Sequence, residues 1–280
     1  MRATVGERLR AAVDTLAAAG VPEPRADAEV LMAYALTSSR PSVVARSREA
    51  LSPPADVRFS ALVERRAERV PVFYLTGRRE FWSLDIDVDP RVLIPRPETE
   101  LLVETTCRLA PDARQVLECG TGSGALAAAL AAELPRACVV GTDRSRDALA
   151  VASCNLRRLA PGASLVCGDW LTMVRADSID VVVANPPYVP DSALDALASE
   201  VRDHEPREAL VAGQDGLRDL AVLIDQAPSV LRAGGWVVLE MGIGQAVAVA
   251  EVARARKAYR TIEIVSDHAG IERVLAARRR

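Results

Sequence analysis

The chain has 280 residues, half of them hydrophobic, so it is long enough to bury the cores of two domains. Its 35 basic and 38 acidic residues give a formal net charge of −3, which lacks the positive excess expected of a protein whose main partner is nucleic acid. No apolar run approaches the roughly 18 residues of a membrane span. The N-terminus shows no apolar segment followed by a cleavage site, so we expect no signal peptide.

The few cysteines and histidines limit the chemistry further. The five cysteines form no C-x-x-C pair, so the sequence offers neither a zinc ribbon nor a redox pair, and we expect a protein of the reducing cytoplasm. The two histidines, His204 and His268, are too few for a His-rich metal site. Without a G-x-S-x-G motif, a serine hydrolase is not favoured either. We therefore expect no metal in the site.

Residues 1–76 are predicted to form a small helical domain. Apolar residues recur at helical spacing from Val5 to Leu16, from Arg25 to Leu36 and from Asp56 to Arg69. This part contains no glycine-rich loop or polar cluster, so we interpret it as a scaffold or as a surface that recognises the substrate.

Residues 77–97 are predicted to form a β-hairpin linker. From Leu84 to Asp89 apolar and acidic residues alternate, as in a strand with one face in water. We interpret the three aspartates as a solubilising face and not as a metal cluster. Pro95 and Pro97 then hold the backbone extended, and the acidic residues after Pro97 suit the first turn of a helix.

Residues 98–280 are predicted to form an α/β domain, because strand and helix patterns alternate along them. The candidate strands are Gln115–Cys119, Ala137–Thr142, Ser164–Cys167, Ile179–Ala184, Trp236–Glu240, Thr261–Val265 and Arg273–Ala276. This order predicts a mainly parallel, doubly wound sheet with helices on both faces. The short connection between the last two strands predicts a terminal antiparallel hairpin.

A first motif joins a hydrophobic strand to a glycine-rich turn and then to a helix. Glycines at alternate positions let the backbone turn sharply and approach a ligand, and the helix that follows offers free N–H groups. The residues predicted to bind a cofactor here are Glu118, Gly120, Thr121, Gly122, Ser123 and Gly124. Taken alone, the motif also satisfies the dinucleotide pattern G-x-G-x-x-G/A.

Two further strand ends carry residues suited to an adenosine group. Asp143 ends a strand 19 residues beyond Gly124, where a carboxylate can accept both hydroxyl groups of a ribose. That ribose belongs equally well to NAD or to S-adenosylmethionine. Asp169 and Trp170 follow the next strand, where they can hydrogen-bond to an adenine ring and face it. All three are predicted to bind the cofactor.

The motif Asn185-Pro186-Pro187-Tyr188 follows a buried-type strand and decides between these cofactors. The prolines fix the backbone, and carbonyl oxygens of Asn185 and Pro186 can accept the hydrogens of a planar NH₂ group that stacks on Tyr188. A methyl group on a sulfonium is already a strong electrophile, so catalysis can rest on positioning and electrostatics. We predict that Asn185, Pro186 and Tyr188 are catalytic, that all four residues bind the substrate, and that Asn185 also contacts the cofactor.

These motifs together resemble the class I S-adenosylmethionine-dependent methyltransferases that methylate nitrogen. Over nearly its whole length the chain resembles the HemK/PrmC family of protein-glutamine N(5)-methyltransferases. Besides the glycine turn and Asn-Pro-Pro-Tyr, the likeness includes Arg25–Glu29, Tyr74–Gly77, Arg79–Trp82, Leu93–Glu100, Glu205-Pro206 and Glu272–Val274. The stretch Ile-Pro-Arg-Pro-Glu-Thr-Glu that ends at Glu100 is the most family-specific of these.

The resemblance implies transfer of a methyl group from S-adenosylmethionine to the glutamine side-chain amide in the Gly-Gly-Gln motif of class-1 peptide-chain release factors. It implies that Gly120–Gly124, Asp143, Trp170 and Asn185 contact the cofactor, and that Asn185–Tyr188 hold the glutamine amide. It also implies that the N-terminal helices help to receive the protein substrate. We expect a cytoplasmic monomer with no direct nucleic acid partner and no membrane association.

Three alternatives stay open at this point. A relative can use the same four residues to methylate glutamine on a ribosomal protein, although Pro-Glu-Thr-Glu after Ile-Pro-Arg favours release factors. A DNA adenine N(6)-methyltransferase has a similar pocket, but it must flip its base and hold duplex DNA, which this slightly acidic chain does not favour. A binding protein that has lost activity is opposed by the intact motifs. Departures from the family pattern at Cys119, His204 and His268 bear on substrate docking and not on methyl transfer.

Overall fold

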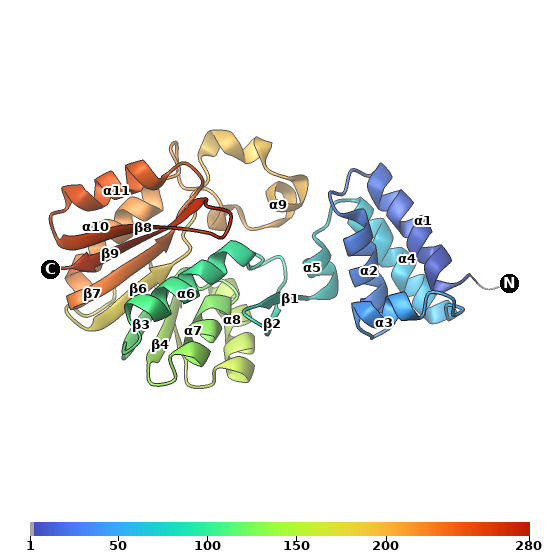
Figure 1. Ribbon diagram of the computed structural model, residues 1–280, viewed down its shortest axis with the longest axis horizontal. Helices are drawn as coiled ribbons and strands as arrows, with labels where there is room; N and C mark the ends of the chain where they lie inside the picture. Colours follow the sequence, from blue (N-terminus) through green and yellow to red (C-terminus); the bar gives the residue numbers. More distant parts are fainter. Residues whose placement is uncertain (1–2) are drawn as a thin grey trace. The chain divides into compact units, whose positions relative to one another are not determined.

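The computed structural model describes residues 3–280, and the chain divides into two compact units. The first unit consists of the described residues up to Arg78 together with Ala198–His204, and the second consists of Arg79–Leu197 and Glu205–Arg280. Figure 1 shows that the first unit is helical and that the second contains the large sheet. The domain limits expected from the sequence stay a prediction, and no sequence pattern indicated that 198–204 would group with the N-terminal helices.

The first unit is a set of helices around one apolar core. Its helices are α1 (Val5–Ala18), α2 (Pro24–Ala35), α3 (Arg40–Ala45), α4 (Pro53–Ala67), α5 (Val72–Thr76) and α9 (Ser199–His204). The bulkiest side chains that are fully buried in this core are Leu16, Leu31, Met32 and Phe59. At the start of α1, Thr4 and Glu7 form a capping box, in which each side chain accepts a hydrogen bond from the other residue's backbone N–H.

The helices expected from the sequence are α1, α2 and α4, and these are confirmed. α4 starts three residues before the predicted Asp56, because prolines occupy its first turn without losing a hydrogen bond. The helices α3, α5 and α9 have six, five and six residues, which is too short to repeat an apolar period, so the pattern did not predict them.

An ion-pair network holds α9 within the first unit. Glu200 accepts hydrogen bonds from Arg66 at 2.7 Å and from Arg69 at 2.6 and 2.9 Å. Arg66 also donates to Asp27 at 2.7 Å, and only 5% of its side chain is exposed. Burial alone would raise the pKa of Glu200, but the hydrogen bonds from Arg69 and Arg66 lower it to about 2. Glu200 therefore stays charged at neutral pH.

A two-stranded hairpin leads into the second unit, formed by β1 (Arg78–Phe81) and β2 (Leu84–Asp87). Trp82 and Ser83 make the turn with φ values of 51° and 57°, the paired positive values of a tight hairpin turn. In and after β2, Ile86 and Val88 are buried, whereas Asp85, Asp87 and Asp89 keep contact with solvent. The alternation in this stretch is thus a difference between a buried and a solvated face.

A seven-stranded sheet forms the centre of the second unit. Its strands are β3 (Gln115–Cys119), β4 (Cys138–Asp143), β5 (Ser164–Cys167), β6 (Ile179–Ala184), β7 (Leu231–Glu240), β8 (Tyr259–Ser266) and β9 (Glu272–Arg279). They lie in the order β5-β4-β3-β6-β7-β9-β8, with β3 to β7 parallel and β9 antiparallel to both of its neighbours. The mainly parallel, doubly wound sheet with a terminal antiparallel hairpin is therefore confirmed.

Two layers of helices cover this sheet (Figure 1). On one face lie α6 (Glu100–Leu109), α7 (Ala125–Glu133) and α8 (Arg146–Leu159), and on the other lie α10 (Arg218–Val230) and α11 (Ala246–Ala255). Three short 3₁₀ helices, η1 (Pro97–Thr99), η2 (Asp191–Ala196) and η3 (Arg207–Ala209), belong to the connections. Among residues 3–280, no helix combines the length and the apolar character needed to span a bilayer.

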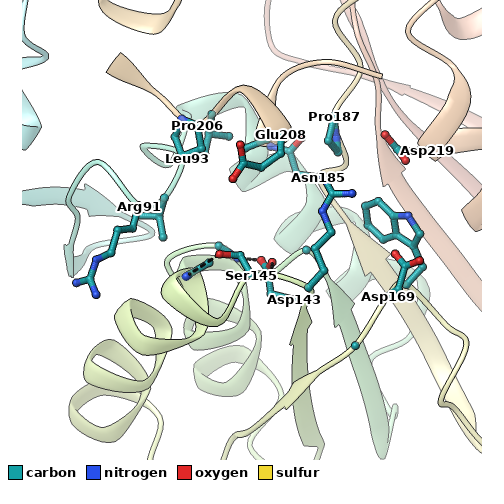
Figure 2. A pocket seen from close by; sticks show the side chains of 18 residues that line it. Arg91, Leu93, Asp143, Ser145, Asp169, Asn185, Pro187, Pro206, Glu208 and Asp219 are labelled. Atoms are coloured by element: carbon teal, nitrogen blue, oxygen red, sulfur yellow. Dashed lines mark hydrogen bonds between the residues drawn. The ribbon is translucent and has the colours of Figure 1, made fainter. Parts of the chain in front are cut away.

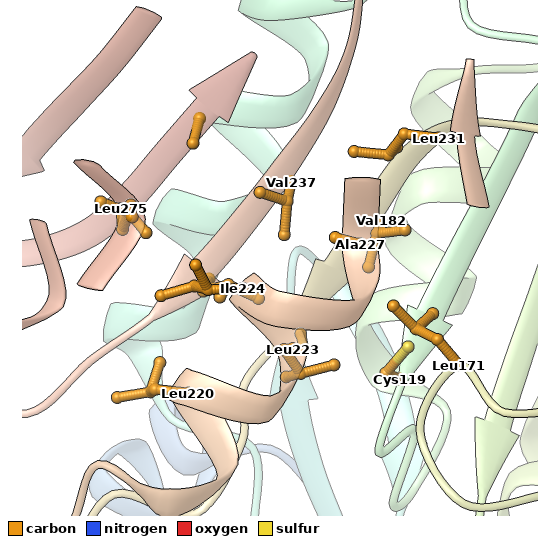
Figure 3. Close-up of a cluster of buried hydrophobic side chains, with 14 of the residues drawn as sticks. Cys119, Leu171, Val182, Leu220, Leu223, Ile224, Ala227, Leu231, Val237 and Leu275 are labelled. Atoms are coloured by element: carbon orange, nitrogen blue, oxygen red, sulfur yellow. The ribbon is translucent and has the colours of Figure 1, made fainter. Parts of the chain in front are cut away.

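A buried apolar core lies between α10 and the sheet (Figure 3). Leu223 and Ile224 of α10 face Val182 of β6 and Val237 of β7, and all four side chains are fully buried. Cys119 belongs to the same cluster, so the small residue at this position packs as part of the core. Burial raises the pKa of its thiol to about 12, which makes it chemically inert at neutral pH.

Candidate active site

The ends of four neighbouring strands bring the predicted motifs to one edge of the sheet. Cys119 of β3 lies opposite Thr142 of β4 and Ala184 of β6, and Ala184 lies opposite Leu239 of β7. The glycine turn, Asp143 and the Asn-Pro-Pro-Tyr motif each follow one of these residues. In an open α/β sheet, ligands bind at this carboxyl edge, where the strand order changes direction.

A pocket opens at this edge. The predicted residues that line it are Gly120, Gly122, Asp143, Asp169, Trp170, Asn185 and Pro187. The predicted residues that do not line it are Glu118, Thr121, Ser123, Gly124, Pro186 and Tyr188. Figure 2 shows Asn185 and Pro187 across the opening from Asp143 and Ser145.

The glycine turn needs glycine for two different reasons. Gly120 has a φ of 71°, and a Cβ atom there would lie 3.5 Å from the Trp170 ring. Gly124 has a φ of 79°, and a Cβ atom would lie 3.2 Å from Ala152 of α8. Side chains rarely adopt such φ values, so Gly120 is needed for its backbone conformation, while the close contact at Gly124 also lets α7 begin near α8.

Asp143 is held in place by backbone groups on both sides of its carboxylate. Its Oδ2 atom accepts a hydrogen bond from the N–H of Gly122 at 2.9 Å, and its Oδ1 atom accepts one from the N–H of Ser145 at 2.9 Å. A carboxylate has about four acceptor positions, so these two bonds leave capacity for a ligand. The two backbone hydrogen bonds thus hold the carboxylate at the pocket and leave acceptor positions free for a ligand.

Asp169 and Trp170 lie in a tight turn after β5. Trp170 has a φ of 46°, and the backbone carbonyl of Asp169 accepts a hydrogen bond from the Thr172 hydroxyl at 2.8 Å. The amide of Leu171 donates to Gln226 of α10 at 3.3 Å, and the Leu171 side chain is buried. Buried anchors on one side of the turn thus place the Trp170 ring at the pocket wall.

Glu118 lies behind the glycine turn and not in the pocket lining. Only 3% of it is exposed, and its Oε2 atom accepts a hydrogen bond from the Thr121 hydroxyl at 2.5 Å. Burial raises the pKa of Glu118 to about 8, with a smaller contribution from the charge of Asp143. In the structure this carboxyl group braces the turn from beneath, and its predicted cofactor contact stays a prediction.

A buried asparagine links the glycine turn to the hairpin. Asn155 of α8 donates hydrogen bonds to the carbonyls of Ser123 and Asp87, both at 2.9 Å, and accepts one from the N–H of Asp87 at 2.8 Å. Its side chain is fully buried. A buried amide with three bonds satisfied rigidifies its surroundings, so this residue fixes the back of the glycine turn.

The Asn-Pro-Pro-Tyr motif presents its two ends to different surroundings. Asn185 lines the pocket, and its Nδ2 atom donates to the hydroxyl of Thr99 at 3.0 Å. That bond leaves Oδ1 as the side-chain atom able to accept a hydrogen bond from a ligand. Pro187 also lines the pocket, whereas the Tyr188 hydroxyl donates to the buried carboxyl group of Glu240 at 3.2 Å.

The backbone around Tyr188 is clamped from three directions. Its carbonyl accepts a hydrogen bond from Gln245 at 3.0 Å, while Gln245 accepts one from the N–H of Gly242 at 2.8 Å. A Cβ atom on Gly242 would lie 3.1 Å from the Tyr188 ring. The next residue, Val189, exchanges backbone hydrogen bonds with Leu210 and Ala212. The Tyr188 ring is thus packed against the loop after β7, and its predicted stacking on the substrate amide stays a prediction.

Hydrogen bonds join the Ile-Pro-Arg-Pro stretch to the segment Glu205-Pro206. Arg96 donates to Glu205 at 2.5 Å, and the other oxygen of Glu205 accepts from the N–H of Ile94 at 3.1 Å. Burial raises the pKa of Glu205, and the charge and hydrogen bond of Arg96 oppose that rise. Since Pro206 and Leu93 both line the pocket, this tie connects two parts of its wall.

Several residues of the site were missed by the sequence analysis. The other lining residues are Arg91, Val92, Leu93, Arg144, Ser145, Ala148, Gly168, Pro206, Glu208, Ala209 and Asp219. Thr99 and Glu240 lie behind the motif and contact Asn185 and Tyr188. Glu240 is the last residue of a strand predicted from the sequence, and that strand pairs with the one that precedes Asn185. This strand pairing is the only feature that could have pointed to Glu240. Among the described residues no group of three or more His, Cys, Asp or Glu could hold a metal ion.

Solved structures are similar in fold to this chain. The catalytic domain of hMettl16, bound to an RNA hairpin, superposes with a TM-score of 0.58 at 19% identity, covering 74% of this chain and 79% of that one. A methyltransferase from Pyrococcus furiosus gives a TM-score of 0.51 at 20% identity, covering 70% and 88% of the two chains. Together with the sheet order and the glycine turn, these likenesses define the class: the chain has a class I methyltransferase fold.

Sequence comparisons then identify the family. Residues 7–77 match the PrmC N-terminal domain and residues 97–213 match the methyltransferase small domain. The chain is 47% identical to the release factor glutamine methyltransferase of Moorella thermoacetica, over 99% of both chains. It is 40% identical to that of Geobacter sulfurreducens, over 94% of this chain and 92% of that one. The chain therefore belongs to the release factor glutamine methyltransferase family, as the sequence motifs had indicated.

Proposed function

We propose that this protein transfers a methyl group from S-adenosylmethionine to the side-chain amide of the glutamine in the Gly-Gly-Gln motif of class-1 peptide-chain release factors. The observation that supports it most is the pocket in which Asn185 faces Asp143 across one opening, within a chain 36–47% identical to release factor glutamine methyltransferases. Neither the ribosomal-protein alternative nor the DNA adenine alternative is favoured by these relatives.

The residues on the Asp143 side of the pocket suit the cofactor. The carboxylate of Asp143 keeps acceptor positions free for the two hydroxyl groups of a ribose, because each of its oxygens carries only one backbone bond. The aromatic face of Trp170 and the carboxylate of Asp169 line the adjoining wall and suit an adenine ring. When bound here, S-adenosylmethionine supplies a methyl group on a positively charged sulfur.

The residues on the Asn185 side suit a carboxamide. The Oδ1 atom of Asn185 and the carbonyl oxygen of Pro186 accept the two N–H hydrogens of the glutamine amide. This draws electron density back to the nitrogen and orients its lone pair toward the methyl group. As the new N–C bond forms the C–S bond breaks, and the nitrogen releases one proton to solvent. The pocket acts by orientation and electrostatics, without a charged base.

The partner and the setting are parts of the same proposal. The protein substrate is a release factor with its Gly-Gly-Gln loop extended, and the N-terminal helices help to receive it. The enzyme works as a monomer in the cytoplasm, without direct contact to nucleic acid. The five cysteines, all of which are free thiols, fit a reducing compartment.

The test is methylation of a purified release factor with isotope-labelled S-adenosylmethionine, followed by mass mapping of the product. We expect one label per release factor, on the glutamine of Gly-Gly-Gln. A release factor in which that glutamine is replaced by asparagine serves as the matched control and should remain unlabelled. Label on another residue, or labelling of ribosomal protein or adenine in place of the release factor, would contradict the proposal.

A further inference from the structure

A buried carboxyl group lies directly behind the Asn-Pro-Pro-Tyr motif and has no part in the reaction described above. Glu240 is the last residue of β7 and is only 2% exposed. The register that sets Ala184 opposite Leu239 places Glu240 beside Asn185. One of its oxygens, Oε2, has no hydrogen-bond partner among the described residues. Burying a carboxyl group without full hydrogen bonding costs stability, so its presence here calls for a functional reason.

Glu240 lies beside two hydroxyl groups, which contact the two ends of the motif. The Tyr188 hydroxyl donates to its Oε1 atom at 3.2 Å. The Thr99 hydroxyl lies near the same carboxyl group and lowers its pKa. Thr99 in turn accepts from the Nδ2 atom of Asn185 at 3.0 Å. One carboxyl group therefore connects Asn185, through Thr99, with Tyr188.

A hydrogen bond from Thr99 to the nearby Glu240 carboxyl group would fix the direction of the bond between Thr99 and Asn185. A threonine hydroxyl has a single hydrogen and two lone pairs. When Thr99 donates that hydrogen to Glu240, it can only accept from Asn185. The amide of Asn185 must then turn its Nδ2 atom toward Thr99 and its Oδ1 atom toward the pocket. This is the orientation that a carboxamide substrate requires, since its N–H groups need an acceptor.

We propose that Glu240 and Thr99 are positioning residues, which orient the Asn185 amide and hold Tyr188 so that the substrate amide is presented for methyl transfer. This inference rests on the proposed function of the pocket. Neither residue lines the pocket, so both act through the motif and not on the reacting atoms.

The ionisation of Glu240 gives the proposal a measurable signature. Burial raises the pKa of Glu240 to about 7, and the hydrogen bonds from Thr99 and Tyr188 oppose the rise. The other charged groups that act on it are Glu98, which raises its pKa, and Arg273 of β9, which lowers it. A carboxylate accepts hydroxyl hydrogen bonds more strongly than a carboxylic acid does. We therefore expect methyl transfer to increase with pH as Glu240 loses its proton near pH 7.

The first experiment compares Glu240→Gln with the wild type at saturating S-adenosylmethionine and release factor. Glutamine keeps the size of the side chain but brings an NH₂ group toward the two hydroxyls. We expect kcat to fall at least about tenfold while the dissociation constant of S-adenosylmethionine stays within about twofold, because only orientation is lost. The rise of kcat around pH 7 should flatten. The matched control is Glu263→Gln on β8, a half-buried carboxylate that does not line the pocket, which should leave both kcat and its pH profile unchanged.

The second experiment separates orientation from simple packing. Thr99→Val removes the hydroxyl group and keeps the shape, whereas Thr99→Ser keeps the hydroxyl group. We expect Thr99→Val to lower kcat about as much as Glu240→Gln does, and Thr99→Ser to restore most of it. The double variant should be little worse than either single variant, because the two residues act through one chain of bonds. Independent, multiplied losses, or equal activity of the Val and Ser variants, would overturn the proposal.

A third readout needs neither cofactor nor substrate. Because the pKa of Glu240 is raised on folding, the wild type loses stability as the pH rises from about 4.5 through about 7, and Glu240→Gln should lack this loss. The urea midpoints of the two proteins should therefore diverge across that range in favour of the variant. Parallel midpoints overturn the placement of Glu240, whatever the enzyme methylates. Divergent midpoints with no methylation of release factors by the wild type overturn only the proposed function.

Discussion

The two sides of the pocket are built in different ways. The carboxylate of Asp143 is held by backbone N–H groups, in the bonds from Gly122 and Ser145. The Asn-Pro-Pro-Tyr side is held by side chains from far along the chain: Thr99 lies 86 residues from Asn185, and Glu240 lies 52 residues from Tyr188. The pocket thus combines a cofactor side whose carboxylate is held by backbone groups with a substrate side whose motif is held by side chains.

Removing the acceptor of the substrate side should have the largest effect on the reaction. We expect Asn185→Ala to lower kcat by about 10²–10³-fold, the loss typical of one preorganised hydrogen-bonding group in an active site. The dissociation constant of S-adenosylmethionine, measured by calorimetry, should change little. Asp112→Ala, on an exposed residue outside the pocket, is the control. Wild-type turnover by Asn185→Ala would remove this residue from the mechanism.

Replacing Glu118, which lies beneath the cofactor side of the pocket, should change how the stability of the protein depends on pH. The pKa of Glu118 is raised on folding to about 8, mainly by burial, so the folded state loses stability as pH rises from about 4.5 through about 8. Glu118→Gln should lack this loss and be more stable than the wild type at pH 9 by on the order of 3 kcal/mol. Urea unfolding at pH 6 and pH 9 measures the difference. Glu104→Gln, an exposed carboxylate on α6, should follow the wild type at both pH values.

The cofactor side itself is tested through Asp143. Asp143→Ala should weaken S-adenosylmethionine binding by about 1–3 kcal/mol, or roughly 5–150-fold, because a charged hydrogen-bonding group is lost. At saturating cofactor, kcat should remain near the wild-type value, which distinguishes this variant from Asn185→Ala. An unchanged dissociation constant would exclude Asp143 from the cofactor site. A large fall in kcat with unchanged affinity would mean that the two sides of the pocket are not independent.

Removing the hydrogen bonds that Gln245 makes behind Tyr188 should have the smallest effect. Gln245→Leu removes the donor to the Tyr188 carbonyl and the acceptor of the Gly242 amide, so stability should fall by about 1 kcal/mol. We expect kcat to fall by a few fold, with the dissociation constant of S-adenosylmethionine unchanged. Thermal unfolding and steady-state kinetics measure the two quantities. Weaker cofactor binding in this variant would show that the clamp also supports the cofactor side.

The same contrast explains what the sequence could predict. The glycine turn, Asp143 and the strand order follow from local rules, in which alternate glycines and apolar periods act over a few residues. The positions of Thr99 and Glu240 do not, because only strand pairing brings them to Asn185 and Tyr188. Of the motif residues, Pro186 and Tyr188 were expected in the pocket but lie outside its lining, because Tyr188 is drawn toward β7. A linear motif gives the residue types, and packing decides which atoms they expose.

The position of Glu200 has a practical consequence for anyone who wishes to separate the two units. The N-terminal helices are completed by Ala198–His204, a stretch whose preceding and following residues both belong to the other unit. A truncation after Arg78 would deprive Arg66 and Arg69 of the carboxylate they share, and a truncation before Arg79 would leave that carboxylate without either arginine. Neither unit can be excised as one continuous piece of sequence. Experiments on the separate units should therefore use the full chain, because each unit needs a segment that lies outside its main stretch of sequence.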